Sequence, residues 1–83
     1  MTNGDEKLIK AIKSVLILDD DEVARNLIAN HFERMGITNV ETFEFATDAL
    51  EACQARRFDF VVSDWKLQGM SGLAFFNRLR NLP

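Results

Sequence analysis

Two runs of consecutive apolar residues that each lead into acids are the clearest pattern in the chain. Val15 to Leu18 is followed directly by four acids, Asp19 to Glu22, and the run that begins at Phe60 ends at Asp64. An apolar run without polar alternation is typical of a strand buried on both faces, as in a parallel sheet. The pattern predicts strands over Ser14–Leu18 and Phe60–Ser63, each with an acid at its carboxyl end.

Helical spacing of apolar residues follows the first predicted strand. From about Asp21 to Met35 the pattern predicts a helix with acids in its first turn and Gly36 at its C-terminal cap. Its inner face is expected to consist of five apolar side chains: Val23, Leu27, Ile28, Phe32 and Met35.

A short strand and a second helix are predicted next. Asn39 to Phe43 is interrupted by Glu41, so an edge strand is expected. Thr47 is the expected N-cap of a helix that runs to about Arg56, with Ala49, Leu50 and Cys53 turned inward.

A loop and a third helix follow the strand at Phe60–Ser63. The segment Lys66 to Met70 is predicted as a loop containing Gly69, and Ser71 is expected to cap the helix. The expected inner face of this helix is Leu73, Phe76 and Leu79.

The predicted order βαβαβα implies an α/β fold, with right-handed crossovers and helices on both faces of a parallel sheet. Residues 14–83 are expected to form this layer. Residues 1–13 are expected to be an N-terminal extension, in which Leu8, Ile9 and Ile12 have helical spacing and could form a short docked helix.

Composition narrows the function classes. The chain has 83 residues and a formal net charge of −3, but Asp19 to Glu22 alone carry −4, so the acidity is local. The ten basic residues are dispersed, which does not indicate nucleic-acid binding. No apolar stretch approaches the ~20 residues of a membrane span. The single cysteine, Cys53, excludes an internal disulfide and favours a cytoplasmic location.

The acids form a candidate metal site. With the strand order 2-1-3, Asp19, Asp20 and Asp64 would meet at the carboxyl edge of the sheet, where open α/β sheets bind ligands. Clustered carboxylates repel one another unless a cation or a proton is present, and hard oxygen donors suit Mg²⁺. Because Mg²⁺ is usually held together with phosphate oxygens, we expect a phosphoryl group at this site, with Asp64 as the nucleophile.

A structural explanation competes for this acid run. Acids are favoured in the first turn of a helix whether or not they bind anything. All four acids, Asp19 to Glu22, could therefore be a solvated cluster at the helix start, although an acid at the end of each of the two apolar runs favours a site.

At these residues the chain resembles the receiver domain of bacterial two-component response regulators, a family with a flavodoxin-like, doubly wound fold. The segment Asp64 to Gly72 is similar to the chemotaxis members, and the resemblance covers Ser14 to Pro83. It implies a signalling module rather than an enzyme, in which Asp64 accepts a phosphoryl group from a histidine kinase, a phosphotransfer protein or a small phosphodonor. It also implies that Mg²⁺ is bound by Asp20, Asp64 and the backbone carbonyl of Lys66.

The resemblance further implies that Asp19 acts mainly through water, and that the Lys66 side chain lies where the family tunes dephosphorylation. Asp21 and Glu22 match no ligand of the family and are interpreted as exposed acids of the first helical turn. Gln68 stands where the family usually has proline, which makes the loop less constrained.

The family has five βα units, and this sequence contains three of them. The switch Thr or Ser and the switch Lys of the family would lie beyond Pro83, so we expect the chain to be the N-terminal portion of a longer regulator. For this segment alone we expect weak or absent stable phosphorylation. The outer edge of the strand at Phe60–Ser63 would be unpaired, which predicts self-association through that edge.

Two other functions stay open. Asp19 and Asp21 also fit the first motif of haloacid-dehalogenase-like phosphohydrolases, with Asp19 as nucleophile, although that family leaves Asp64 unexplained. The chain could also be a half-receiver that binds a partner without being phosphorylated.

Overall fold

The centre of the protein is a parallel sheet of three strands. The computed structural model describes residues 11–67 and 69–82, and its sheet consists of β1 (Ser14–Leu18), β2 (Asn39–Phe43) and β3 (Phe60–Ser63) in the order β2-β1-β3. Ser14 of β1 lies opposite Asn39 of β2, and Leu18 lies opposite both Phe43 of β2 and Ser63 of β3. The predicted α/β fold, its strand order and the three strand boundaries are confirmed.

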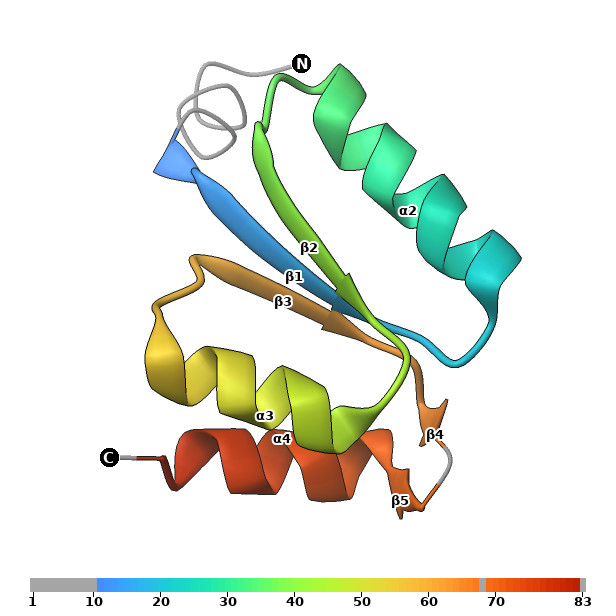
Figure 1. The fold of residues 1–83 in the computed structure, drawn as a ribbon, viewed down its shortest axis with the longest axis vertical. Helices are drawn as coiled ribbons and strands as arrows, with labels where there is room; N and C mark the ends of the chain where they lie inside the picture. The colour runs from blue at the N-terminus through green and yellow to red at the C-terminus, as the bar shows by residue number, and fades with distance from the viewer. Residues whose placement is uncertain (1–10, 68, 83) are drawn as a thin grey trace.

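Helices cover both faces of this sheet. Helix α2 (Glu22–Arg34) lies on one face, and α3 (Ala46–Ala55) and α4 (Gly72–Arg80) lie together on the other (Figure 1). The predicted loop at 66–70 is more regular than expected. Lys66–Leu67 (β4) and Met70–Ser71 (β5) pair as a short antiparallel hairpin. Within the described residues, no helix is long and apolar enough to cross a membrane.

Strand β1 supplies the core on both sides, because successive side chains of a strand point to opposite faces. Leu16 and Leu18 pack with α3 and α4, whereas Val15 and Ile17 pack with α2. All five residues of β1 are buried, which explains its unbroken apolar run. The edge strand β2 is half-exposed, and the polar residue Glu41 fits that position.

The predicted inner face of α2 is partly wrong. Ala29 is its buried residue, and Ile28 and Phe32 are partly buried beside it. Val23 and Leu27 are 67% and 65% exposed. The helix packs against β1 and β2 through the side that carries the small Ala29, so the Val23–Leu27 stripe lies outside the contact. Met35 is also exposed, whereas Gly36 follows the helix with a φ of 93°, as the predicted cap requires.

The predicted N-cap of α3 is wrong by two positions. The N-cap is Phe45, which has no side-chain capping bond, and Thr47 lies inside the first turn. The earlier start places Ala46 in the buried core together with Ala49 and Ala52. Burial of this alanine stripe therefore sets the start of α3, and the capping preference of Thr47 does not.

The predicted inner face of α4 is also partly wrong. Phe75 is completely buried in the core, whereas Leu73 and Phe76 are 54% and 52% exposed. Of the predicted face, Leu79 alone packs against the core. Ser71 does cap the helix, because its Oγ accepts a hydrogen bond from the Ala74 N–H at 3.1 Å.

Gly72 explains why α4 is rotated toward Phe75. Its N–H donates to the Trp65 carbonyl at 2.7 Å, and a Cβ added to Gly72 would lie 2.5 Å from the carbonyl oxygen of Asp64. The first residue of α4 is thus in contact with the chain leaving β3, which only glycine permits. With Gly72 turned inward, Phe75 and Leu79 follow on the same face of the helix.

The outer edge of β3 is unpaired in the described part of the chain. There β3 pairs with β1 and with no further strand, and Phe60 is 44% exposed although its ring centroid lies 5.9 Å from that of Phe32. At the amino-terminal extension, Ile12 packs partly against the Val15–Ile17 side of the core. Leu8 and Ile9, and with them the predicted short helix, lie outside the described residues.

Candidate functional site

The carboxyl ends of β1 and β3 bring two of the predicted site residues side by side. Asp19 directly follows β1, and its N–H donates to the Phe43 carbonyl at 3.1 Å. Asp64 directly follows β3, and its N–H donates to the Leu18 carbonyl at 3.0 Å. The interstrand bonds therefore extend one residue beyond the strands, which places both aspartate backbones at one edge of the sheet.

Three predicted site residues converge at this edge. One carboxylate oxygen from each of Asp19, Asp20 and Asp64 lies within 4.8 Å of the other two. Asp19 is buried, so its charge has little water around it, whereas Asp20 and Asp64 remain accessible to solvent. Buried and clustered carboxylates are stabilised by a cation.

The donor set fits Mg²⁺. Mg²⁺ binds oxygen ligands at about 2.0–2.1 Å, so two oxygens on one ion lie at most about 4.2 Å apart. Neighbouring oxygens of the octahedron lie about 2.9 Å apart. Asp19, Asp20 and Asp64, whose oxygens lie within 4.8 Å of one another, would therefore close around one ion by side-chain rotation, or reach it through a bound water. Because Asp20 and Asp64 are accessible to solvent, the cluster also leaves positions for water and phosphate oxygens, as Mg²⁺ requires.

The remaining acids of the run belong to the start of α2. Asp21 is the N-cap, and its Oδ1 accepts a hydrogen bond from the Val23 N–H at 3.0 Å. Glu22 is the first helical residue and is exposed. The interpretation of both residues as exposed acids of the helix start is confirmed. The loop is tightened further because Asp19 Oδ1 accepts from the Asp21 N–H at 2.9 Å.

Sequence reasoning missed Arg25 at this site. Its Nη1 donates to the backbone carbonyl of Asp19 at 2.7 Å, from the second turn of α2. The position of Arg25 in the sequence could have indicated this contact. Helical side chains tilt toward the N-terminus of the helix, so a long side chain four residues after the N-cap Asp21 can reach back to the end of β1.

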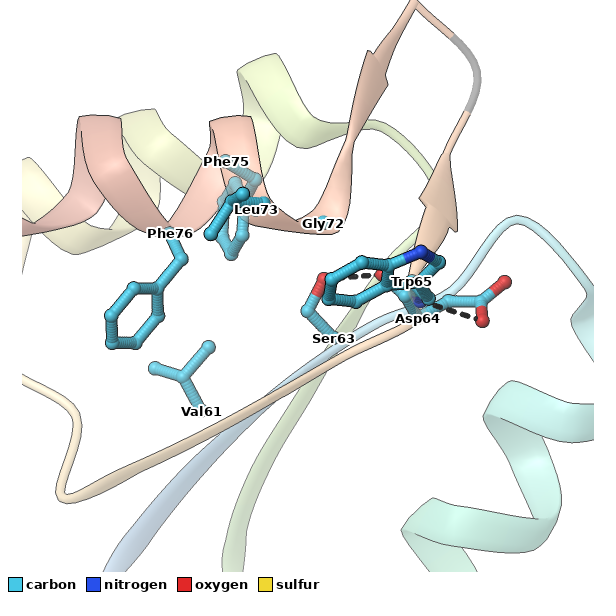
Figure 2. A pocket seen from close by; sticks show the side chains of 8 residues that line it. All are labelled: Val61, Ser63, Asp64, Trp65, Gly72, Leu73, Phe75 and Phe76. Atoms are coloured by element: carbon cyan, nitrogen blue, oxygen red, sulfur yellow. Dashed lines mark hydrogen bonds between the residues drawn. The ribbon is translucent and has the colours of Figure 1, made fainter.

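The surroundings of Asp64 are polar on one side and apolar on the other. Asp64 Oδ1 accepts from the Trp65 N–H at 2.8 Å, and the Ser63 hydroxyl donates to the Asp64 carbonyl at 3.0 Å. Figure 2 shows the Asp64 carboxylate pointing away from an apolar cavity of about 280 Å³ formed by β3 and α4. The cavity is lined by Val61, Ser63, Asp64, Trp65, Gly72, Leu73, Phe75 and Phe76.

Lys66 lies in β4, two residues beyond Asp64, and its side chain is exposed. Its backbone pairs with Ser71 in the hairpin, which fixes the direction of the chain after Asp64. The role of its carbonyl as a metal ligand stays a prediction.

The chain is similar to a known protein family and to chemotaxis proteins. The family model of the "Response regulator receiver domain" matches residues 15–83 of the chain. The chain is 35% identical to the chemotaxis protein CheY of Pseudomonas aeruginosa, over 83% of this chain and 60% of that protein. It is 29% identical to the chemotaxis protein CheY-3 of Vibrio cholerae, over 90% of this chain and 58% of that protein.

A solved structure agrees with this similarity. The CheY-like response regulator receiver domain from Methylobacillus flagellatus superimposes with a TM-score of 0.79 at 33% identity, covering 87% of this chain and 60% of that one. The chain thus spans about 60% of the length of the relatives it matches. Fold, strand order and sequence agree: the chain belongs to the response regulator receiver domain family of two-component signalling.

Proposed function

We propose that this chain is the phosphoacceptor half of a receiver, in which Asp64 takes up a phosphoryl group with the help of Mg²⁺ held by Asp19 and Asp20. The observation that carries the proposal is the convergence of these three carboxylates within 4.8 Å at the carboxyl edge of the sheet. The proposed donor is a histidine kinase or phosphotransfer protein, and the proposed location is cytoplasmic.

The three aspartates are suited to different tasks. Asp19 is buried and has one carboxylate oxygen engaged by the Asp21 N–H, so it suits a fixed, indirect role. Asp20 follows it with access to solvent, which suits direct metal binding. In Asp64, Oδ1 accepts from the Trp65 N–H, which orients the carboxylate and leaves Oδ2 for the incoming phosphorus.

The transfer step is a displacement at phosphorus. A carboxylate oxygen of Asp64 forms an O–P bond while the P–N bond to the donor imidazole breaks, and the imidazole nitrogen leaves with the bonding electron pair. Because the other ring nitrogen of the phosphohistidine carries a proton, the products are an acyl phosphate on Asp64 and a neutral donor histidine. Asp20, Asp64 and the Lys66 carbonyl would hold Mg²⁺, which would supply positive charge against the phosphoryl oxygens.

Trapping the acyl phosphate tests the proposal. The 83-residue chain is incubated with a small phosphodonor and Mg²⁺, reduced with borohydride to trap the labelled residue, and mapped by mass spectrometry. Because stable phosphorylation of this segment is expected to be weak or absent, any trapped label should be of low stoichiometry, lie at Asp64, depend on Mg²⁺ and be lost in Asp64→Asn. Asp59→Asn is the matched control, because Asp59 precedes β3 at the opposite end of the sheet.

The same experiment separates the alternatives. Label on Asp19 that persists in Asp64→Asn would support a haloacid-dehalogenase-like phosphohydrolase. A complete absence of label, together with no response of Trp65 fluorescence to beryllofluoride and Mg²⁺, would support a half-receiver that binds a partner without phosphorylation. Either result would overturn phosphoryl transfer to Asp64.

We also propose that the isolated chain self-associates through the outer edge of β3. Support comes from the unpaired edge in the described part of the chain and from the exposed side chains beside it, Phe60, Leu73 and Phe76. In a two-fold dimer this edge would pair antiparallel with its copy, giving a continuous six-stranded sheet. Light scattering at micromolar concentration tests this, and a monodisperse monomer would refute it.

A further inference from the structure

The acid cluster depends on a loop of three residues that is closed by side-chain hydrogen bonds. Within Asp19 to Asp21, Asp19 Oδ1 accepts from the Asp21 N–H at 2.9 Å, and Asp21 Oδ1 accepts from the Val23 N–H at 3.0 Å. Both bonds hold the end of the loop that leads into α2. The peptide that joins Asp19 to Asp20 is held from another direction, by Arg25.

Arg25 is attached at two points to this loop. Its backbone N–H donates to the Asp21 carbonyl at 2.9 Å as part of the helix, and its Nη1 donates to the Asp19 carbonyl at 2.7 Å. The Asp19 carbonyl belongs to the peptide that leads into Asp20. A short hydrogen bond from a charged donor to this carbonyl therefore sets the orientation from which the Asp20 side chain departs.

Arg25 leaves the carboxylates free. In the described residues, the ion pair within 4.0 Å joins Arg56 to Glu41, and Arg25 has no carboxylate partner at that distance. The guanidinium thus contacts the backbone of the acid loop without occupying the oxygens that a cation would need. Arg25 is also partly buried, which limits competition from water for its hydrogen bond.

We propose that Arg25 is a positioning residue of the Mg²⁺ site, which holds the Asp19–Asp20 peptide so that both carboxylates face Asp64. This inference rests on the proposed function of the acid cluster. Groups that orient metal ligands from outside the coordination sphere typically change metal affinity by about 10- to 100-fold when they are removed.

Two effects of Arg25 on Mg²⁺ have opposite signs, which makes the proposal testable. Arg25 is a positive charge near the site and repels the cation. If this electrostatic effect were the only one, removal of Arg25 would raise the affinity for Mg²⁺. As a positioning residue, it organises the ligands, so its removal would weaken binding. The direction of the change in Arg25→Met therefore distinguishes positioning from a merely electrostatic effect.

The experiment is a Mg²⁺ titration of the full 83-residue chain and its variants, followed by calorimetry and Trp65 fluorescence. We expect Arg25→Met to bind Mg²⁺ about 10-fold more weakly. Arg25→Lys, which keeps the charge and one donor, should recover part of the loss. Arg34→Met is the matched control, because Arg34 is exposed in the last turn of the same helix, and it should bind as the unchanged chain does. Equal or tighter binding by Arg25→Met would overturn the proposal.

Amide hydrogen exchange without metal gives an independent readout. We expect the Asp21 amide, which donates to Asp19 Oδ1, to exchange faster in Arg25→Met while core amides of β1 keep their protection. Unchanged exchange at Asp21 would count against positioning. If Arg25→Met does not fold, Arg25→Lys takes its place in both measurements. If the unchanged chain binds no Mg²⁺, the proposed function fails, whereas the exchange measurement still decides whether Arg25 orders the loop.

Discussion

The two ends of the sheet use the same residue type for opposite purposes. At the amino end, Asp59 Oδ2 accepts backbone hydrogen bonds from Lys13 at 2.8 Å and Ser14 at 3.3 Å. At the carboxyl end, Asp20 and Asp64 direct carboxylate oxygens toward Asp19 and toward one another. At the amino end a single carboxylate oxygen accepts two N–H groups from the start of the neighbouring strand. At the carboxyl end three carboxylates lie close together, and in the described residues those of Asp19 and Asp64 each accept only one N–H, from a residue one or two positions further along the chain.

This difference explains what each end can do. The Asp59 carboxylate joins the starts of β1 and β3 through its two hydrogen bonds, and in the described residues it is not part of a cluster of three carboxylates. Carboxylates that face one another raise the energy of the metal-free protein, and a divalent cation relieves that repulsion. The carboxylate at the amino end therefore stabilises the sheet, whereas the carboxylates at the carboxyl end are suited to bind a cation. Variants at matched positions can test this division.

The largest expected effect is on stabilisation by Mg²⁺. For the unchanged chain we expect saturating Mg²⁺ to raise the free energy of unfolding by about 2.7 kcal/mol at 100 times the dissociation constant. Asp64→Asn and Asp20→Asn remove one cluster carboxylate each, so most of this gain should disappear in either variant. Urea unfolding with and without Mg²⁺ measures the gain.

The matched control is Asp59→Asn, which makes the same chemical change at the amino end. Its Mg²⁺-dependent gain should equal that of the unchanged chain, although its stability without metal is lower. A loss of the gain in Asp59→Asn, or its survival in Asp64→Asn, would contradict the division between the two ends.

A second prediction concerns the backbone contact that supports the carboxyl end. In Gly72→Ala the new Cβ would lie 2.5 Å from the Asp64 carbonyl oxygen, so either the start of α4 or the chain after β3 must move. We expect a loss of about 1–3 kcal/mol in the free energy of unfolding, the usual cost of overpacking. Because the shift occurs at Asp64, Mg²⁺ affinity should fall as well, which calorimetry measures.

Gly36→Ala is the contrasting variant. Gly36 has a φ of 93° with no atom within 4 Å of an added Cβ, at a helix end away from the acids. It should lose stability through backbone strain and keep its Mg²⁺ affinity. Unaltered stability and affinity in Gly72→Ala would show that the close approach is not required.

A third, smaller effect is expected from Asp59→Ala. This change leaves the Lys13 and Ser14 N–H groups without their carboxylate partner, at a cost of about 1–2 kcal/mol in the free energy of unfolding. Phosphoryl uptake at Asp64 should persist under conditions where the variant is folded. Thermal unfolding followed by circular dichroism measures the cost, and loss of uptake in the folded variant would contradict the prediction.

The strands and the acid cluster could be predicted from the sequence because both depend on local patterns. The apolar runs predicted β1 and β3, and the position of an acid at each strand end placed Asp19 and Asp64 at one edge once the order of the strands was assumed. The assignment of Asp21 and Glu22 to the helix start agrees with the N-cap position of Asp21. Apart from the strand order, these predictions needed no knowledge of tertiary contacts.

The helix faces were harder to predict because several apolar residues compete for the same core. In α4, Phe75 and Phe76 are adjacent, and periodicity alone allowed either to be buried. The choice is made by Gly72 against the Asp64 carbonyl, a contact between segments joined by a hairpin. In α3, burial of Ala46 outweighed the capping preference of Thr47. Arg25 was missed for a similar reason, because its partner is a backbone carbonyl.

The smallest expected effect is the pH dependence contributed by the ion pair between β2 and the end of α3. Arg56 Nε donates to Glu41 Oε2 at 2.7 Å, and this hydrogen bond holds the pKa of Glu41 below its usual value of 4.5. The folded-state pKa is lowered, so the pair's contribution is fully present above the unfolded pKa and is lost as the pH falls through the folded value. Both side chains are partly exposed, which keeps the contribution small.

Glu41→Gln should therefore lose less stability than the unchanged chain between about pH 5 and pH 3. Urea unfolding across this range measures the difference, and identical pH profiles would show that the pair contributes nothing. Mg²⁺ binding at neutral pH should be the same in both proteins, because Glu41 lies on the edge strand and is not a member of the acid cluster.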